Sequence, residues 1–197
     1  MAVRPTRPAL RERFDRRREE LVAGAAREFA HRGYDQTTMQ ELAASMGLAT
    51  GALYHYFAAK DALLRAICDQ LMEPLLESAR SLAATEAEPA ERLRALVGLW
   101  VAHVCAHRDH MLVFQQERHM IESGAEWRQV RASRKAFERL LASAIDDLGA
   151  GGTRVDPDLA LRALLSMVNY TASWYRPRGA LRPAQIADGY VALVLAG

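Results

Sequence analysis

The residues best equipped for chemistry gather between positions 38 and 60, on both sides of Gly47. Apolar residues recur at helical spacing over 38–46 and again over 50–56, so this segment predicts two short helices joined by a glycine turn. In a helix-turn-helix of this kind, the second helix enters the DNA major groove by its N-terminal residues. The spacing therefore indicates DNA reading as the chemistry of the segment.

The side chains of this segment match what a DNA duplex offers. Hydroxyls and cations such as those of Tyr54 and Lys60 bind phosphates, which supply most of the affinity and fix the register. The hydroxyl of Thr50 can bond a base edge, while Gly51 and Ala52 allow close approach or contact with a thymine methyl. The candidate DNA-binding residues are Thr38, Thr50, Gly51, Ala52, Tyr54, His55, Tyr56 and Lys60.

Helical periodicity continues along the chain and no stretch alternates at strand spacing, so the expected fold is all-α with about nine helices. Gly33 suits a left-handed cap after the first helix, and Thr38 with Glu41 forms a capping-box pattern for the second. Pro74 is expected to kink or end the fourth helix, unless the helix carries on past the lost hydrogen bond. The expected helices span about 14–31, 39–46, 50–56, a long stretch from 61, a fifth from 89, and then 109–122, 125–148, 157–175 and 183–196.

From Gly33 to Leu64 the sequence reads GYDQTTMQELAASMGLATGALYHYFAAKDALL, which resembles the N-terminal signature of the tetracycline-repressor (TetR) family. The matching positions are Gly33, Tyr34, Thr37, Thr38, Leu42, Ala43, Gly47, Leu48, Gly51, Leu53, Tyr54, Phe57, Lys60, Leu63 and Leu64. Ala49 departs from the pattern, because the family usually places a capping serine there, and we expect Thr50 to take over that cap. The resemblance implies a three-helix helix-turn-helix DNA-binding domain over 14–60 and a larger helical ligand-binding and dimerisation domain over 61–197. The arginines before residue 14 add a basic N-terminal arm over 1–13.

The string LLSMVNYTASWYRPRG at 164–179 is similar to a branch of this family that represses fatty-acid and sterol catabolism and senses acyl-CoA thioesters. The resemblance implies a homodimeric repressor of a double-stranded, palindromic operator, released by a small apolar or acyl-CoA-like effector. An apolar pocket with a few polar anchors would hold that effector. The candidate ligand-binding residues are Trp100, Phe114, Phe137, Met167, Asn169, Tyr170 and Trp174.

The last two helices are expected to pair with those of a second copy, as the family implies. Seven apolar residues of these helices are the candidates for that interface. They are Leu161, Leu164, Leu165, Val168, Ile186, Val191 and Val194.

The distribution of charge agrees with a DNA partner at the N-terminal end. Residues 1–60 hold ten Lys and Arg against seven Asp and Glu, whereas the rest of the chain has one acidic group in excess. The arginines at 4, 7, 11, 13 and 16–18 form either a flexible arm that reaches DNA or a solvated tail. Apolar stretches end well before the ~20 residues of a membrane span, and no secretory signal begins the sequence, so we expect a cytoplasmic protein without membrane contact. Cys68 and Cys105 are expected to be two small buried thiols.

A second class of function stays open at this point. His103 and His107 stand four residues apart, with further His, Asp and Glu residues close by, and such spacing can bind a transition metal. The alternative is therefore a helical metal-binding or catalytic domain. Because no catalytic or nucleotide-binding motif is present, we expect neither an enzyme nor a cofactor.

Overall fold

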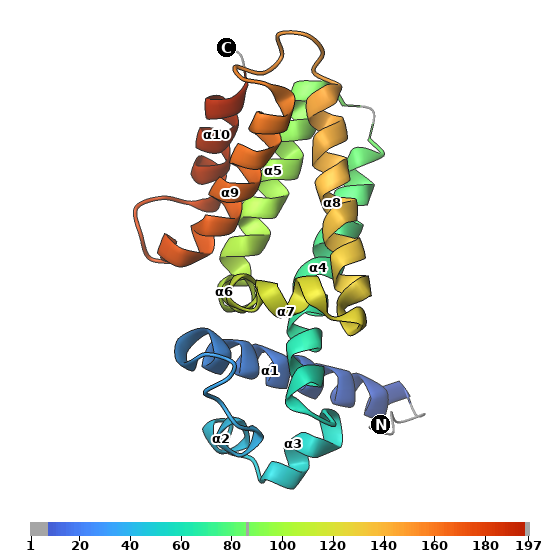
Figure 1. Ribbon diagram of the computed structural model, residues 1–197, viewed down its shortest axis with the longest axis vertical. Helices are drawn as coiled ribbons and strands as arrows, with labels where there is room; N and C mark the ends of the chain where they lie inside the picture. Colours follow the sequence, from blue (N-terminus) through green and yellow to red (C-terminus); the bar gives the residue numbers. More distant parts are fainter. Residues whose placement is uncertain (1–7, 86, 196–197) are drawn as a thin grey trace.

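The structure, a computed structural model, describes residues 8–85 and 87–195 (Figure 1). The predicted all-α class is confirmed: in these ranges the chain forms ten α-helices and one 3-10 helix, with a single isolated antiparallel bridge between Thr153 and Leu195. The elements are α1 (Pro8–Arg32), α2 (Met39–Ser45), α3 (Thr50–Tyr56), α4 (Lys60–Ala83), α5 (Pro89–Ala106), α6 (Arg108–Gln116), α7 (Arg118–Ser123), η1 (Ala125–Trp127), α8 (Arg128–Asp146), α9 (Pro157–Trp174) and α10 (Pro183–Val194).

The helices α1, α2 and α3 form a small unit that we call the reading head. Gly33 and Gly47 adopt φ angles of 87° and 67°, which only glycine adopts at low cost, and they end α1 and α2 as predicted. Each of the three helices contributes buried residues to the hydrophobic core, among them Phe29, Leu42 and Leu53. The first helix begins at Pro8, so residues 8–13 are helical and the expectation of a flexible arm is wrong for them, whereas residues 1–7 lie outside the described part.

The fourth helix connects the reading head with the rest of the molecule. It runs for 24 residues from Lys60 to Ala83 and continues through Pro74, so of the alternatives at this proline the helix does not end there. Pro74 is exposed, which leaves the carbonyl that loses its helical partner within reach of water. In Figure 1, α4 rises from the reading head into the upper helices as one element.

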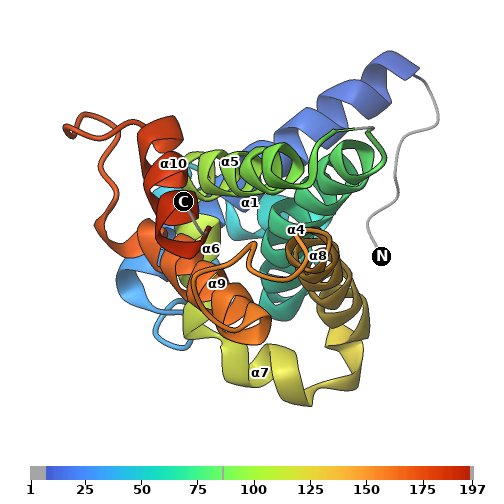
Figure 2. The same ribbon diagram turned by 90° about the horizontal axis from the view of Figure 1, so that it is seen from above.

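The remaining helices form a second unit, the body. Helices α5 and α8 pack beside the upper half of α4, α9 packs on α5 and α8, and α10 packs on α5 and α9. Helices α6 and α7 lie across the end that faces the reading head (Figures 1 and 2). The predicted 109–122 segment is two helices, because the chain breaks at Glu117, and this gives ten α-helices in place of about nine. Cys68 is buried as expected, but Cys105 is only half-buried.

The surfaces of α9 and α10 differ from the expected dimer contact. Five of the seven candidate residues already pack inside one chain, each at most 4% exposed, so they are core and the prediction was wrong for them; they are Leu164, Val168, Ile186, Val191 and Val194. Leu161 and Leu165 are half-buried. Large apolar side chains that do remain exposed on these helices are Leu159, Tyr170, Trp174 and Leu193.

Candidate DNA-reading head and ligand cavity

Helix α3 begins with a half-buried Thr50, which the exposed Gly51 and Ala52 follow. Ala49 is the N-cap in extended backbone and makes no side-chain cap hydrogen bond, so Thr50 is the first helical residue. The prediction that Thr50 takes over the cap is therefore wrong, and no hydrogen bond within residues 8–85 or 87–195 engages its hydroxyl. Gly51 and Ala52 are exposed beside it, while Leu53 is fully buried and anchors the helix. The leading edge of α3 is thus free for contact with bases.

The three aromatic side chains at the end of α3 have different surroundings. Tyr54 is 49% exposed, and His55 is also exposed. Tyr56 is half-buried and stacks on Phe14 of α1, with the ring centroids 4.8 Å apart. This stack fixes α3 against α1, so α1 supports the angle at which α3 projects.

Thr38 caps α2 as predicted. Its side-chain oxygen accepts from the backbone N–H of Glu41 at 3.2 Å, and the Glu41 carboxylate accepts from the Thr38 N–H at 2.8 Å. These hydrogen bonds, the backbone one above all, hold the pKa of Glu41 below its usual value, and Arg32 adds to the effect. Thr38 is exposed, so its oxygen remains within reach of a phosphate while it caps the helix.

Lys60 is the only lysine or arginine in residues 33–60. Its ammonium points back toward Tyr34, in the connection after α1. The Nζ atom donates to the Tyr34 carbonyl at 2.9 Å and lies 4.2 Å from the centre of the Tyr34 ring. The Tyr34 hydroxyl donates to Asp61, and burial together with that carboxylate raises its pKa. Because an ammonium has three N–H donors, Lys60 retains donors for a phosphate after it has bonded Tyr34.

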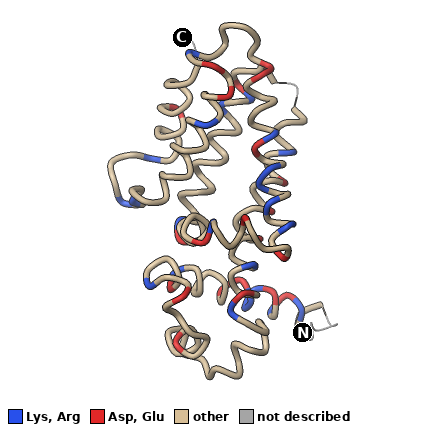
Figure 3. Tube along the Cα trace, viewed as in Figure 1, with Lys and Arg blue, Asp and Glu red and all other residues tan. Residues whose placement is uncertain are grey.

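The surface of the reading head around α2 and α3 carries little charge. From 33 to 59 the charged residues are Asp35 and Glu41, and the arginines of the reading head lie on α1 (Figure 3). The chemistry of this surface is therefore that of hydroxyls, aromatic rings and small residues, with cations at its edges.

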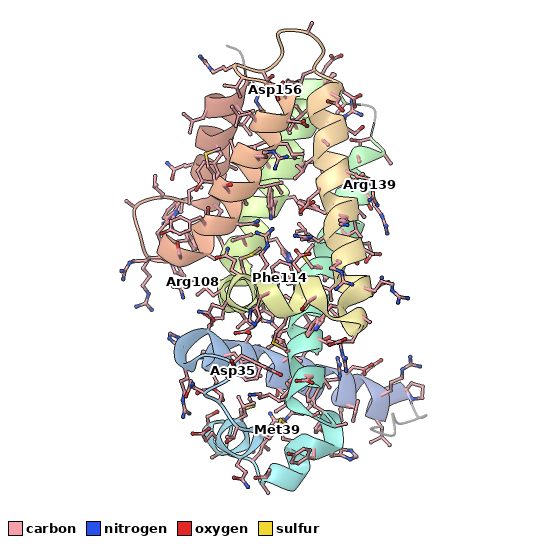
Figure 4. The ribbon with its side chains drawn as sticks, viewed as in Figure 1. Asp35, Met39, Arg108, Phe114, Arg139 and Asp156 are labelled. Carbon is pink, nitrogen blue, oxygen red and sulfur yellow. The ribbon has the colours of Figure 1, made fainter. Side chains whose placement is uncertain are left out.

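A cavity of about 290 Å³ lies between α4, α5, α6, α8, α9 and the start of α7, and we call it the inner cavity. Trp100 and Phe137 meet edge to face in its wall at 5.1 Å. Its lining is Met72, Trp100, Met111, Phe114, Gln115, Arg118, Arg134, Phe137, Glu138, Leu165, Ser166, Asn169 and Tyr170. Figure 4 labels Phe114 on α6, between the reading head and the upper helices.

The cavity includes five of the seven candidate ligand-binding residues, namely Trp100, Phe114, Phe137, Asn169 and Tyr170. Met167 and Trp174 are not in its lining. Met167 lies about 100° around α9 from Ser166 and packs against the core, and Trp174 lies one turn beyond Tyr170, past the cavity.

The polar side of the cavity holds two arginines, Arg118 and Arg134, and neither is among the candidate residues from the sequence. Arg134 is the more buried of the two. Its Nη1 lies 2.9 Å from Glu122, and its Nε is buried without a hydrogen bond. Arg118 pairs with the same glutamate at 3.7 Å. The signal was present in the sequence, because Arg134 shares the inner face of α8 with Val130, Phe137 and Leu141 at helical spacing.

The histidines do not form a metal centre. The Nε2 of His103 lies 2.7 Å from the Leu71 carbonyl, which can only accept, so this nitrogen carries a proton. His110 reaches Gln70 at 3.2 Å, and burial lowers the pKa of His103 and of His110 to about 4. Within the described ranges, no group of three or more His, Cys, Asp or Glu residues could hold a metal ion. The metal-binding alternative therefore finds no support.

A helix-turn-helix unit joined by one helix to a body with a ligand-sized cavity defines a DNA-binding regulator of the ligand-responsive type. Comparison with known proteins agrees. Residues 21–67 match the family described as bacterial regulatory proteins, tetR family, and residues 86–197 match the tetracyclin repressor-like C-terminal domain. The chain belongs to the TetR family of transcriptional regulators.

Several relatives are similar over nearly the whole chain. The transcriptional repressor KstR2 of Mycobacterium tuberculosis (strain H37Rv) is 29% identical over 185 residues, 92% of each chain. The structure of that ketosteroid transcriptional regulator superposes with a TM-score of 0.84 at 26% identity and covers 92% of this chain and 96% of its own. AibR in complex with isovaleryl coenzyme A and operator DNA gives a TM-score of 0.76 at 31% identity, over 91% and 98% of the two chains.

None of the described helices is long and apolar enough to cross a membrane.

Proposed function

We propose that this protein is a transcriptional repressor that binds a palindromic operator as a homodimer and releases it when an acyl-CoA-like effector enters the inner cavity. The observation that carries the proposal is the continuity of α4. Its first residue, Lys60, is bonded into the reading head, and Met72 of the same helix lines the inner cavity. An effector that displaces α4 therefore reorients the reading head directly, because the same helix contacts both the inner cavity and the reading head.

In this proposal α3 enters the major groove by its N-terminus. Thr50, Gly51 and Ala52 lie against base edges, and the residues around them contact phosphates. The phosphate contacts come from Thr38, Tyr54, His55, Tyr56 and Lys60. The exposure of Tyr54 and the unused hydroxyl of Thr50 support this assignment.

The size of the inner cavity limits the part of the effector that it encloses. About 290 Å³ is at the small end of ligand pockets, which suits an acyl group rather than a whole coenzyme A thioester. Arg118 and Arg134 lie on the polar side, where guanidinium groups can pair with an anionic part of the ligand. The similarity to a structure that holds isovaleryl coenzyme A supports this class of effector.

The effector would act through α6 as well as α4. Gln115 and Arg118 line the cavity, while Gln116, between them, reaches the Ala30 carbonyl of α1 at 3.5 Å. Glu117 is buried beside the reading head, where burial and Asp35 raise its pKa. For release, the effector must bind one orientation of the reading head more tightly than the other.

The homodimer in this proposal forms through the exposed faces of α9 and α10. Leu159, Tyr170 and Leu193 are 54%, 66% and 65% exposed, which is unusual for large apolar side chains. On α10 the exposed residues Gly189 and Ala192 lie near Leu193, and their small size allows a second helix to approach closely. These side chains replace the buried residues that the sequence suggested.

The relatives are repressors rather than enzymes, which supports a protein without catalytic activity that acts in the cytoplasm, where its operator lies. The domain limits in this proposal are 14–60 for DNA binding and 61–197 for effector binding and dimerisation. The start of α4 at Lys60 supports the boundary between them.

The test is a fluorescence anisotropy titration with the DNA that flanks the protein's own gene, in excess unrelated DNA. Isovaleryl-CoA and longer acyl-CoA thioesters are added in parallel, with free CoA as the control. We expect a thioester to release the operator, and Arg134→Gln to raise the thioester concentration needed while Arg139→Gln, on the exposed face of α8, does not. Operator binding that no thioester disturbs would refute the effector class, and the absence of any specific operator would refute the repressor.

A further inference from the structure

A second cleft, of about 610 Å³, opens where the reading head meets the body, and we call it the junction cleft. Its walls come from α1, from the turn between α5 and α6, and from the end of α9 with the loop that follows. In Figure 4, Arg108 is labelled at the start of α6, above α1. Trp174 is the one candidate ligand-binding residue in this cleft.

The junction cleft concentrates positive charge from three separate elements. Arg27 comes from α1, Arg108 from α6 and Arg176 from the loop after α9, against the single carboxylate of Asp109. Arg108 pairs with Asp109 at 3.4 Å, yet its Nε is buried without a hydrogen bond. The guanidinium groups of Arg27 and Arg176 make no ion pair or hydrogen bond with any residue in 8–85 or 87–195. The cleft therefore has guanidinium donors to spare.

The start of α6 adds neutral donors to this charge. His107 is its N-cap and supplies no side-chain cap hydrogen bond, so the first backbone N–H groups of a nine-residue helix are left without a cap acceptor. Arg108, Asp109 and His110, whose N–H groups these are, all line the cleft. A helix N-terminus beside arginines is a favourable environment for a phosphate.

We propose that the junction cleft binds the phosphate group of a small phosphorylated ligand. Guanidinium groups bind phosphate oxygens in pairs, and arginines from three elements can surround one or two phosphates. Trp174, 40% exposed, offers a flat apolar surface for the rest of the ligand. The ligand bridges the reading head and the body, and so it stabilises the orientation of the head that this structure shows.

This site is distinct from the inner cavity. Between them, α6 packs on α9, and Gln115 donates to the Asn169 carbonyl at 2.6 Å. The phosphate has two possible sources with the same chemistry, a separate phosphorylated metabolite or the nucleotide part of a coenzyme A thioester whose acyl group lies elsewhere. The site itself does not depend on which source is used.

The test is isothermal titration calorimetry of the full-length protein with pyrophosphate at constant ionic strength. We expect saturable binding, with one site per chain, that Arg27→Gln and Arg176→Gln each weaken by about tenfold or more, as the loss of a charged hydrogen bond does. Arg94→Gln and Arg139→Gln, exposed on α5 and α8, are matched controls that we expect to leave the affinity unchanged. Arg176 lies in an exposed loop, so its variant tests the site even where Arg27→Gln fails to fold.

Two results would overturn the proposal: no saturable binding of pyrophosphate, or the same loss of affinity in the control variants as in Arg27→Gln and Arg176→Gln. Adenosine 3′,5′-bisphosphate and an acyl-CoA then identify the source by competition. Displacement of pyrophosphate by both would support the site with coenzyme A as its ligand. Displacement by neither, with pyrophosphate binding intact, would support the site with a separate metabolite as its ligand. This assay needs no operator, so its outcome is independent of the proposed repressor function.

Discussion

Replacing Lys60 with methionine separates the two roles that its ammonium can have. The variant Lys60→Met keeps the apolar stem over the Tyr34 ring but removes the charge that donates to the Tyr34 carbonyl at 2.9 Å and lies 4.2 Å from the ring. A charged hydrogen bond contributes about 1.5–3 kcal/mol and an exposed cation–π contact about 0.5–1 kcal/mol. Because Lys60 is only half-buried, water replaces part of both contacts, and we expect a total loss of about 1–2 kcal/mol.

Two assays follow from this estimate. For a protein of this size, about 1–2 kcal/mol lowers the melting temperature by about 2–8 °C. If Lys60 also neutralises a phosphate, the slope of log affinity against log salt falls by about 0.9 for each reading head, so by about 1.8 for a homodimer on its operator. Operator titrations by anisotropy at several salt concentrations measure that slope.

Lys135, the other lysine of the chain, provides the control. It is exposed on α8, and we expect Lys135→Met to change neither the melting temperature nor the salt slope. A lower melting temperature for Lys60→Met with an unaltered salt slope would refute the phosphate contact. Lys60 would then serve only to hold the connection after α1 against the start of α4.

Further substitutions test other parts of the account. Thr50→Ala is expected to reduce the discrimination between bases at one operator position by about 1–3 kcal/mol and to leave the salt slope unchanged. The same loss of affinity on all operator variants would contradict a base contact. Leu193→Asp, on the exposed face of α10, should produce monomers by sedimentation, and a persistent dimer would place the interface elsewhere. Folding lowers the pKa of His103 from 6.5 to about 4, so between these pH values the unfolded chain binds a proton at His103 that the folded chain does not. The free energy of unfolding should therefore fall as pH drops from about 6.5 to about 4. Urea unfolding should show a weaker pH dependence for His103→Gln, and the same dependence as in the wild type would contradict the burial of a neutral imidazole.

The features that the sequence predicted correctly depend on short-range interactions. The capping box of Thr38 with Glu41 involves residues three apart, and Gly33 and Gly47 end helices because their backbone takes positive φ. The side chain of Asp156 caps α9 in the same local way, because it accepts from the backbone N–H groups of Asp158 and Leu159. Such signals survive in any tertiary context because both partners belong to the same turn.

The features that the sequence did not predict depend on which helix lies opposite. The apolar faces of α9 and α10 indicate that these residues are buried, but not whether their own chain or a second copy buries them. Leu164 and Val191 are buried by their own chain. Arg134 lies in a cavity wall because Glu122, twelve residues earlier, approaches it at 2.9 Å. Position along α9 was also decisive, since Trp174 shares a face with Tyr170 but extends beyond the inner cavity.

The most direct test of the central claim is a footprint of the purified protein on the DNA that flanks its own gene, combined with the mass of the complex. A homodimeric repressor should protect one palindrome whose half-sites lie about one helical turn, 34–36 Å, or a multiple of it apart, with the two chains of a dimer bound. In the wild type the Thr85 hydroxyl donates to the Leu82 carbonyl at the far end of α4, away from the reading head. The variant Thr85→Ala should therefore protect the same DNA as the wild type, whereas Thr50→Ala should give an altered footprint. Binding without sequence preference would contradict the assignment of a DNA-reading head. Identical footprints of Thr50→Ala and Thr85→Ala on every variant of the half-site would contradict the base contact of Thr50.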